Sequence, residues 1–144
     1  MRTIARAGSL ALAISLSLAL AGCVAPQEPR ADLIEGTWML ESFGGSEGLS
    51  PSDPAVPTEI TLDEGEAQGS GGVNSFVAAY TAEDGGTLAF DAIQATEMAG
   101  PPQAMEQESR FFEALSDVRR FESDGVKLVL SDSGNNTLVV LVPK

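Results

Sequence analysis

The segment Thr58-Glu-Ile-Thr-Leu-Asp63 decides the class of fold that this chain can adopt. Its apolar residues, Ile60 and Leu62, alternate with the polar residues Glu59 and Thr61. Successive side chains of a β-strand point to opposite faces, so this period of two predicts a strand with one face in a core and the other in water. Half-buried strands of this kind are typical of antiparallel sheets. An antiparallel sheet is therefore the basis of the expected fold.

Other segments with strand character lie on both sides of this one. Strands are expected near residues 37–43, 66–72, 74–80, 87–90, 118–122, 126–131 and 137–142. In the first of them, Trp38 and Leu40 are expected on one face, and Met39 and Phe43 on the other. The glycine- and proline-rich segment 44–57 is expected to be a loop.

One segment reads as a helix, from Pro101 or Pro102 to about Ser116. Proline is well tolerated in a first helical turn, where its missing amide hydrogen has no partner to lose. Apolar residues recur on one side of this segment, at Met105, Phe112 and Leu115. Glu106 and Arg110 are spaced to form an i, i+4 ion pair. The expected fold class is α+β, mostly antiparallel strands with one helix inserted late.

The start of the chain has the pattern of an exported lipoprotein. Two cations, Arg2 and Arg6, precede the apolar run 10–20, which is too short to span a bilayer comfortably. The run ends in Leu20-Ala-Gly-Cys23, which matches the bacterial lipobox at all four positions. Residues 1–22 are therefore expected to be a signal peptide, and Cys23, the only cysteine, to carry the lipid.

The remaining chain is expected to comprise a lipidated tether, residues 23–34, and one domain, residues 35–144. Its charge is strongly acidic: 8 basic and 21 acidic residues give −13, and removing Arg2 and Arg6 gives 6 − 21 = −15. Such a surface repels nucleic acid and anionic lipid head groups, so the expected partners include no nucleic acid and the membrane is expected to be reached through the lipid alone. The acidity favours solubility; a role in binding cations or a basic partner is the alternative.

The residue content excludes several kinds of chemistry. There is no histidine, so neither a Ser-His-Asp nor a Cys-His arrangement can be built, and zinc sites based on histidine or cysteine are excluded. Segments 63–66 and 132–136 carry oxygen ligands but lack EF-hand spacing, and turn chemistry explains both more simply. Carboxylate pairs, as in glycoside hydrolases, remain available, but nothing singles one out. No enzyme activity, metal or cofactor is therefore expected.

The glycine-rich segment 71–76 allows two interpretations. Its glycines permit the close approach of a ligand, to which Asn74 would present its amide. Alternatively, the glycines mark a bulge and Asn74 supports the neighbouring backbone, which is the preferred interpretation. Phe76 and Tyr80 are candidate core anchors, and an aromatic cavity around them is the alternative.

The order of several short motifs resembles the META domain family, which includes the HslJ-like bacterial envelope lipoproteins. The matching pieces are Gly36-Thr-Trp38 with Leu40, residues 69–76 with Tyr80, Thr96-Glu-Met-Ala-Gly100, Glu106 with Phe112 and Leu115, and Leu128-Val-Leu130. Family members often carry cysteines at two of these places, where this chain has Val73 and Gly100. The joint absence favours a lost disulfide bridge over two independent losses, because a lone exposed thiol is a liability.

The resemblance implies a small curved antiparallel sheet, or a partly open barrel, with one helix packed across it. It supplies no catalytic residues, and it associates the protein with stress responses of the envelope. The leading hypothesis is a non-enzymatic, monomeric, membrane-anchored domain that binds or supports another envelope component, for example by pairing an edge strand with it. The alternative is a carrier or sensor of a small hydrophobic ligand held within the sheet, and a carboxylate-based hydrolase is a third hypothesis.

The residue after the lipobox cysteine bears on localisation. Val24 is not the aspartate that favours retention in the inner membrane in many two-membrane bacteria. The protein is therefore expected on the outer membrane, facing the periplasm, if the cell has two membranes. Otherwise it is expected on the outer face of the cell membrane.

Overall fold

The computed structural model describes residues 28–45 and 47–144, so the expected signal peptide (1–22) and the lipidation site Cys23 lie outside the described residues. The described elements, in chain order, are the 3₁₀-helix η1 (Ala31–Ile34), β1 (Gly36–Gly45), β2 (Gly48–Pro51), β3 (Glu59–Asp63), β4 (Glu66–Ser70), β5 (Ser75–Glu83), β6 (Thr87–Ala95), α1 (Pro102–Asp117), β7 (Arg120–Ser123), β8 (Leu128–Ser131) and β9 (Thr137–Pro143). Of the described helices, none is both long and apolar enough to cross a membrane.

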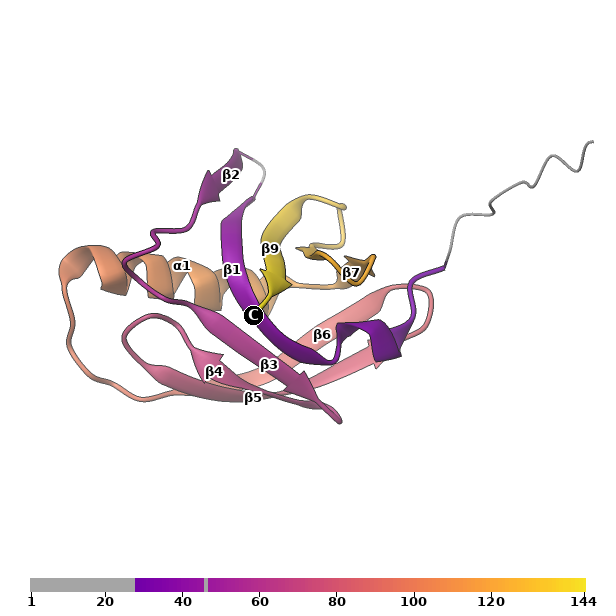
Figure 1. Ribbon diagram of the computed structural model, residues 1–144, viewed down its shortest axis with the longest axis horizontal. Helices are drawn as coiled ribbons and strands as arrows, with labels where there is room; N and C mark the ends of the chain where they lie inside the picture. The colour runs from indigo at the N-terminus through magenta and orange to yellow at the C-terminus, as the bar shows by residue number, and fades with distance from the viewer. Residues whose placement is uncertain (1–27, 46) are drawn as a thin grey trace, which may run out of the picture.

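All the described strands belong to one antiparallel sheet, in the order β2-β1-β3-β4-β5-β6-β7-β8-β9. Strand β1 also pairs with β9, so the sheet closes into a ring (Figure 1). The ring is weakest between β6 and β7, which are joined by the single pair Thr87–Arg120. Helix α1 packs against β1, β6 and β9. The expected α+β class, one helix on a curved antiparallel sheet, is confirmed.

The core lies between the inner face of the sheet and α1. In β3, Ile60 and Leu62 are almost completely buried, as their alternation predicts. The largest side chains with almost no exposure include Phe111, Phe121, Leu88, Leu115, Leu128, Leu130 and Leu141. These side chains form one hydrophobic cluster with Phe76 and Tyr80. Packed apolar side chains therefore fill the space enclosed by the described strands and the helix.

The two faces of β1 differ from those expected. Trp38, Leu40 and Phe43 are all buried, although the alternation placed Phe43 opposite the other two. The register with β9 shifts between Leu40 and Ser42, which inserts one extra residue into β1. A bulge of this kind returns the next residues to the opposite face, and this brings Phe43 into the core.

Segment 44–57, expected to be a loop, is partly a hairpin. Strand β1 continues to Gly45 and pairs with β2, which places Gly44 beside Leu49 and Gly45 beside Gly48. A Cβ atom on Gly44 would lie 2.0 Å from the carbonyl oxygen of Gly48, so only glycine allows this close pairing. The glycines that predicted a loop therefore permit a tight strand pair instead.

The folded part also begins before residue 35, the expected domain boundary. Ile34 is completely buried, and its carbonyl accepts a 2.7 Å hydrogen bond from the indole nitrogen of Trp38. Pro29 accepts a backbone hydrogen bond from Gly85, and the backbone amide of Ala31 donates to Asp84. The polar composition of this segment predicted a tether, because the burial of Ile34 and the backbone hydrogen bonds of Pro29 and Ala31 are not visible in the sequence.

Helix α1 agrees with the expected segment, but its buried face is different. Phe111 and Leu115 are completely buried, whereas Met105 and Phe112 are only half-buried. The expected ion pair of Arg110 with Glu106 is not among the ion pairs of the described residues. The Arg110 guanidinium instead lies over the ring of Phe43, 4.7 Å from its centroid, where it makes a cation–π contact.

Candidate functional site

Helix α1 turns two consecutive polar side chains toward the protein interior. Gln107 is 6% exposed and Glu108 is 4% exposed. Burying a carboxylate is costly unless hydrogen bonds replace the lost water. The contacts of these two side chains therefore identify the part of the molecule where polar groups are held with most constraint.

Glu108 accepts three hydrogen bonds from the segment between β4 and β5. Its Oε2 atom accepts from the backbone amides of Val73, at 2.9 Å, and Asn74, at 2.5 Å. Its Oε1 atom accepts from the Asn74 side-chain amide at 2.6 Å. Hydrogen bonds to a carboxylate are stronger than those between neutral groups, so these contacts fix the segment to the helix.

Asn74 connects Glu108 to the segment that follows β6. Besides donating to Glu108, its Nδ2 atom donates to the carbonyl of Met98 at 3.1 Å. Its Oδ1 atom accepts from the Thr96 hydroxyl at 2.8 Å and from the Met98 amide at 2.7 Å. An asparagine side chain has two donor hydrogens and two acceptor lone pairs, and all four are used here. Asn74 therefore holds three segments together and has no free polar group for a ligand.

Gln107 makes a second set of contacts beside the first. Its Nε2 atom donates to the Val56 carbonyl and to the Thr58 hydroxyl, and its Oε1 atom accepts from the Asp53 amide. The Thr58 hydroxyl in turn donates to the carbonyl of Gly71. Within the described residues, no buried side-chain nitrogen or oxygen lacks a partner. The two helix residues thus fasten the connections that surround them.

Two glycines allow these segments to approach the helix and each other. A Cβ atom on Gly71 would lie 2.6 Å from Cγ of Glu108 and 2.7 Å from the ring of Phe112. A Cβ atom on Gly100 would lie 3.3 Å from Cβ of Val73. The two positions at which family members often carry cysteines are therefore in contact. This contact supports the lost-bridge interpretation, because a small outward shift would bring the two Cβ atoms to the separation of about 3.5–4.5 Å found in disulfides.

A groove of about 590 Å³ lies beside this network, between the chain that follows β6 and one side of α1. Its lining residues are Asn74, Ala95, Thr96, Glu97, Met98, Ala99, Met105, Glu108, Ser109 and Phe112. Met98 is 57% exposed and, together with Met105 and Phe112, gives the groove an apolar part. The start of α1 and the segment before it lie at the left end of Figure 1, whereas the described chain begins at the right end. The groove and the start of the described chain are therefore at opposite ends of the molecule.

The residues expected to form a ligand or structural motif have structural contacts. Phe76 packs edge-on against Phe112 and Phe111, with ring centroids 5.2 and 6.0 Å apart. Tyr80 lies in the same core, and its ring centroid is 6.2 Å from that of Phe90. The Asn74 side chain is thus fully bonded, and the rings of Phe76 and Tyr80 are packed in the core.

Sequence reasoning did not find Glu108, Gln107 or Met98. Glu108 lies four residues before Phe112 and seven before Leu115, so it belongs to the inner side of the helix. A charged residue inside an apolar stripe is the signal that would have identified it. Met98 lies in a segment without periodicity, and its exposure could be recognised only in the structure.

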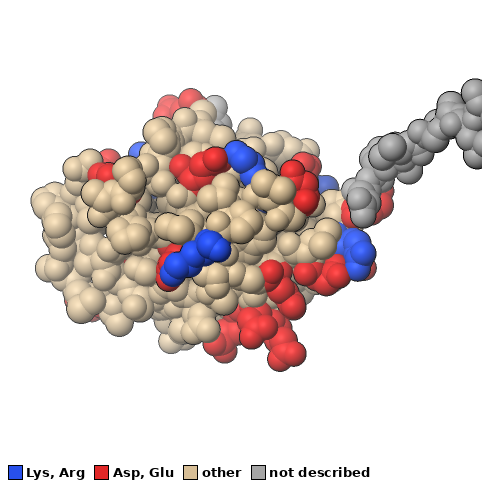
Figure 2. Space-filling model, viewed as in Figure 1, with Lys and Arg blue, Asp and Glu red and all other residues tan. Residues whose placement is uncertain are grey.

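Acidic side chains are spread over the face seen in Figure 2, and one group of them lies along its lower right edge. The hairpin of β3 and β4 carries Asp63, Glu64 and Glu66 at its turn end. Asp132, in the other segment considered for calcium, accepts hydrogen bonds from the backbone and side chain of Asn136 and from the Gly134 amide. These bonds hold the pKa of the Asp132 carboxyl below its usual value. Among the described residues, no group of three or more histidine, cysteine, aspartate or glutamate side chains is placed to hold a metal.

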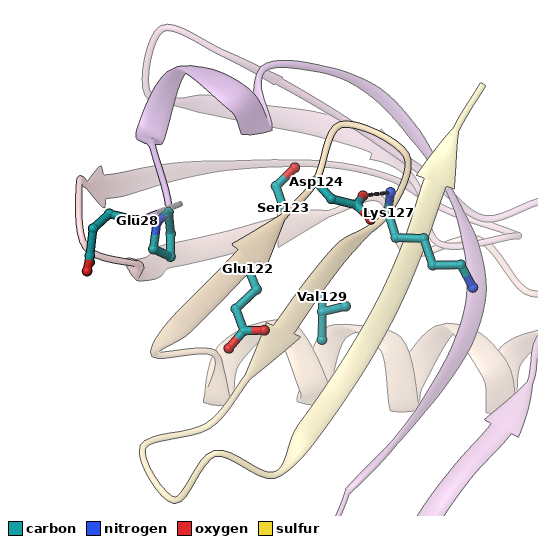
Figure 3. A pocket seen from close by; sticks show the side chains of 7 residues that line it. Glu28, Glu122, Ser123, Asp124, Lys127 and Val129 are labelled. Carbon is teal, nitrogen blue, oxygen red and sulfur yellow. Dashed lines mark hydrogen bonds between the residues drawn. The ribbon is translucent and has the colours of Figure 1, made fainter. Parts of the chain in front are cut away.

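A second hollow, of about 480 Å³, lies on the outer face of β7 and β8 (Figure 3). Its lining includes Glu28 and Pro29, which belong to the segment where the described chain begins. Lys127 at its edge forms an exposed ion pair with Glu41, and its backbone amide donates to Asp124. The side chains of Asp124 and Lys127 thus bond to backbone groups of their own turn and to Glu41, respectively.

The alternative hypothesis of a carrier for a small hydrophobic ligand gains no support from the described residues. The hollows at the surface of the described residues are open, and the space between the sheet and α1 is filled by the core side chains. The carrier hypothesis required a cavity there. We therefore do not retain it as a proposal.

Comparison with known proteins places the chain in a family. A model of the META domain matches residues 31–144. The chain belongs to the META domain family. The match begins at the first residue of η1, in agreement with the buried position of Ile34.

This META domain shares its fold with solved structures of low sequence identity. An NMR structure of a protein from Burkholderia xenovorans is similar, with a TM-score of 0.65 and 22% identity, over 85% of this chain and 93% of that one. The crystal structure of a DUF4847 family protein from Bacteroides vulgatus is also similar, with a TM-score of 0.56 and 17% identity, over 78% and 94% of the two chains. No curated protein matches this META domain. At these identities the likeness concerns the fold alone.

Proposed function

We propose that this META domain is a non-enzymatic lipoprotein domain that binds another protein of the cell envelope through the groove beside Met98. The observation that carries the proposal is the exposed Met98 side chain in a groove whose walls are fixed by Asn74 and Glu108. Methionine is flexible and polarizable, and it is often used on surfaces that bind other proteins. Apolar groups exposed on a rigid support favour association, because little conformational freedom is lost on binding.

The position of the groove supports an anchored adaptor. A lipid on Cys23 would hold the chain at its N-terminal end. The start of α1 and the segment before it, which line the groove, lie at the opposite end of the described domain from its first residues (Figure 1). The acidic surface would not adhere to anionic lipids, so the groove would remain available to a partner. The proposed location is the periplasmic side of the outer membrane, or the outer face of a single membrane.

The binding proposal is tested with two matched substitutions of exposed apolar residues. Met98→Glu places a charge in the groove, and Val126→Glu places the same charge on the β7–β8 turn, where Val126 is 66% exposed. Each form is gently extracted from host envelopes and examined by native mass spectrometry. We expect the wild type and Val126→Glu to retain a bound protein, and Met98→Glu to lose it. A complex that survives in Met98→Glu contradicts the proposed role of the groove.

The anchoring proposal has a separate test. Cys23→Ala removes the thiol that would receive the diacylglyceryl group. We expect palmitate labelling to be lost and the protein to leave the membrane fraction, because membrane binding then lacks its lipid. Cys23→Ser is a second variant that retains a polar side chain of similar size. Persistent palmitate labelling of either variant would show that the lipobox interpretation is wrong.

A further inference from the structure

In the segment that follows β6, some backbone amides and carbonyls beside the groove make no hydrogen bond within the described residues. The amide of Thr96 donates to the carbonyl of Ser75, and Met98 bonds to the Asn74 side chain through both its amide and its carbonyl. The Asn74 side chain, just before the start of β5, thus takes the place of backbone groups in the pairing of β5 with β6. The segment 96–98 is bonded on the side that faces β5, as a continuation of β6 would be.

The backbone groups of Glu97 and Ala99 point to the side opposite β5. Successive backbone groups of an extended chain point to opposite sides, so Glu97 and Ala99 direct theirs away from Asn74. Within the described residues, neither of these two residues donates or accepts a backbone hydrogen bond. Both are exposed and line the groove, whose opposite wall is formed by Met105, Ser109 and Phe112 of α1.

A bulge in β6 sets this orientation. Ala79 pairs with Asp91 but Val77 pairs with Gln94, so β6 contains one more residue than β5 between these pairs. Ala92 lies at this place with a φ of 43°, an uncommon backbone conformation for a residue with a side chain. Before the bulge, the amide of Leu88 points toward β7, whereas after it the amide of Thr96 points toward β5. Because of the extra residue, the backbone groups of Glu97 and Ala99, and not those of Thr96 and Met98, point away from β5.

The charges of the groove restrict its occupant. Of its lining residues only Glu97 and Glu108 are charged, and the Glu108 carboxylate is fully engaged with Val73 and Asn74. Glu97 is therefore the exposed charge at the edge, and the whole chain carries −13. A free strand edge beside apolar side chains and an acidic group matches an extended peptide with alternating basic and aliphatic residues.

We propose that this groove binds such a peptide by strand addition to residues 95–99. The backbone of the peptide exchanges hydrogen bonds with Glu97 and Ala99, its aliphatic side chains pack on Met105 and Phe112, and a basic side chain pairs with Glu97. This inference rests on the proposed function and specifies the chemistry of the partner. It predicts recognition of a peptide backbone, which contact with the Met98 side chain alone does not require.

The probe is the synthetic peptide acetyl-KLKVKLK-amide, added to the purified ¹⁵N-labelled full chain. We expect the amide hydrogens of Glu97 and Ala99 to exchange at least about tenfold more slowly when the peptide is bound. The same peptide with N-methylated backbone amides is the matched control, and it is expected not to bind. Glu97→Lys is expected to weaken binding about tenfold, whereas Glu113→Lys, the same reversal on an exposed helix position outside the groove, is expected to have little effect.

The results separate this inference from the proposed function. Unchanged exchange at Glu97 and Ala99, or equal binding of the N-methylated peptide, would overturn strand addition. Slow exchange that depends on protein concentration without peptide would assign the edge to a second copy of the chain, and would also overturn it. If Met98→Glu still loses its envelope partner in either case, the proposed function stands and only the peptide chemistry is wrong.

Discussion

At the scale of single residues, Glu108 shows how a carboxylate can be buried among hydrogen-bond donors, and it takes part in none of the ion pairs of the described residues. Three donors surround it, two from the backbone and one from Asn74, and they replace the water that the group would otherwise bind. The charge is thus stabilised by dipoles that the fold holds in place. The side chain consequently holds the segment between β4 and β5 against α1 by hydrogen bonds.

Replacing this carboxylate by an amide tests its role. Glu108→Gln replaces one of the two accepting carboxylate oxygens by an NH₂ group, which is a donor. At least one of the three donors around it then loses its acceptor. We expect the free energy of unfolding to fall by about 1–3 kcal/mol, because buried donors then lack partners. Urea unfolding measures the change, with Glu106→Gln, on the exposed side of the same helix, as the control within about 0.5 kcal/mol. Equal values for the two variants would show that the network does not stabilise the fold.

Tyr80, the only tyrosine in the chain, gives a pH-dependent signal from the core. Burial raises its pKa above the ordinary value of 10.0, and the charges of Glu35 and Asp63 act in the same direction, while a hydrogen bond with the Gly65 backbone opposes them. The unfolded chain therefore loses this proton first as the pH rises. The stabilising contribution is complete below the unfolded pKa and is lost as the pH rises through the folded pKa.

We expect the tyrosinate absorbance of the native protein to appear above the pH at which free tyrosine ionises. The urea midpoint is expected to fall over the same range, and Tyr80→Phe is expected to remove this part of the fall, because phenylalanine keeps the ring and cannot ionise. A native titration at or below the ordinary pKa would contradict the burial of the hydroxyl.

At the scale of elements, the contact between Val73 and Gly100 joins the β4–β5 connection to the β6–α1 connection. A Cβ on Gly100 would lie 3.3 Å from that of Val73, so a small shift would bring two cysteines to bonding geometry. We expect Val73→Cys with Gly100→Cys, in a Cys23→Ala chain, to form a disulfide. The loop of 100 − 73 = 27 residues corresponds to a stabilisation of about 3–4 kcal/mol.

Urea unfolding of this double variant with and without reductant measures the gain. The reduced form is the control, since it contains the same side chains without the bridge. A midpoint that does not differ between the two forms would show that the bridge strains the folded state as much as it constrains the unfolded one. Failure to oxidise would show that the two connections lie further apart than the contact indicates.

The elements also show which parts of the fold could be predicted from the sequence. Clean alternation in Thr58–Asp63 and a well-formed apolar stripe with proline at the start of α1 are local signals, and both elements were found where expected. The side of β1 that carries Phe43 depends on a bulge opposite β9, a strand far along the chain, and no local pattern encodes it. The second half of β6 was missed for the same reason, because the bulge at Ala92 interrupts its alternation.

The candidate site was predictable only in part. Asn74 stood out because it lies in the glycine-rich segment 71–76, and the structural interpretation of it agrees with its contacts. Its partners Glu108 and Thr96 are 34 and 22 positions away along the chain, so the network needs the folded arrangement to become visible. The groove is defined by the same long-range packing.

At the scale of the whole molecule, the excess of negative charge opposes compactness. The charge of −13 is carried mostly by exposed carboxylates, and three exposed ion pairs are found in the described residues. We expect sodium chloride to raise the melting temperature, since repulsion among surface charges is screened over about 10 Å at 0.1 M. The gain is expected to be about 1 kcal/mol or less, and a fall with added salt would contradict this balance.

The closure of the sheet by β1 and β9 has a consequence for the order in which the chain acquires structure. Leu40 pairs with Leu141, and these residues are 141 − 40 = 101 positions apart. A contact of this range is costly in loop entropy and slows folding. When such a chain emerges from a channel with its N-terminus first, β1 cannot pair with β9, and the ring cannot close, until the last strand has emerged. The polypeptide is therefore suited to passing through a channel as an extended thread and to folding as one cooperative unit only when β9 has emerged.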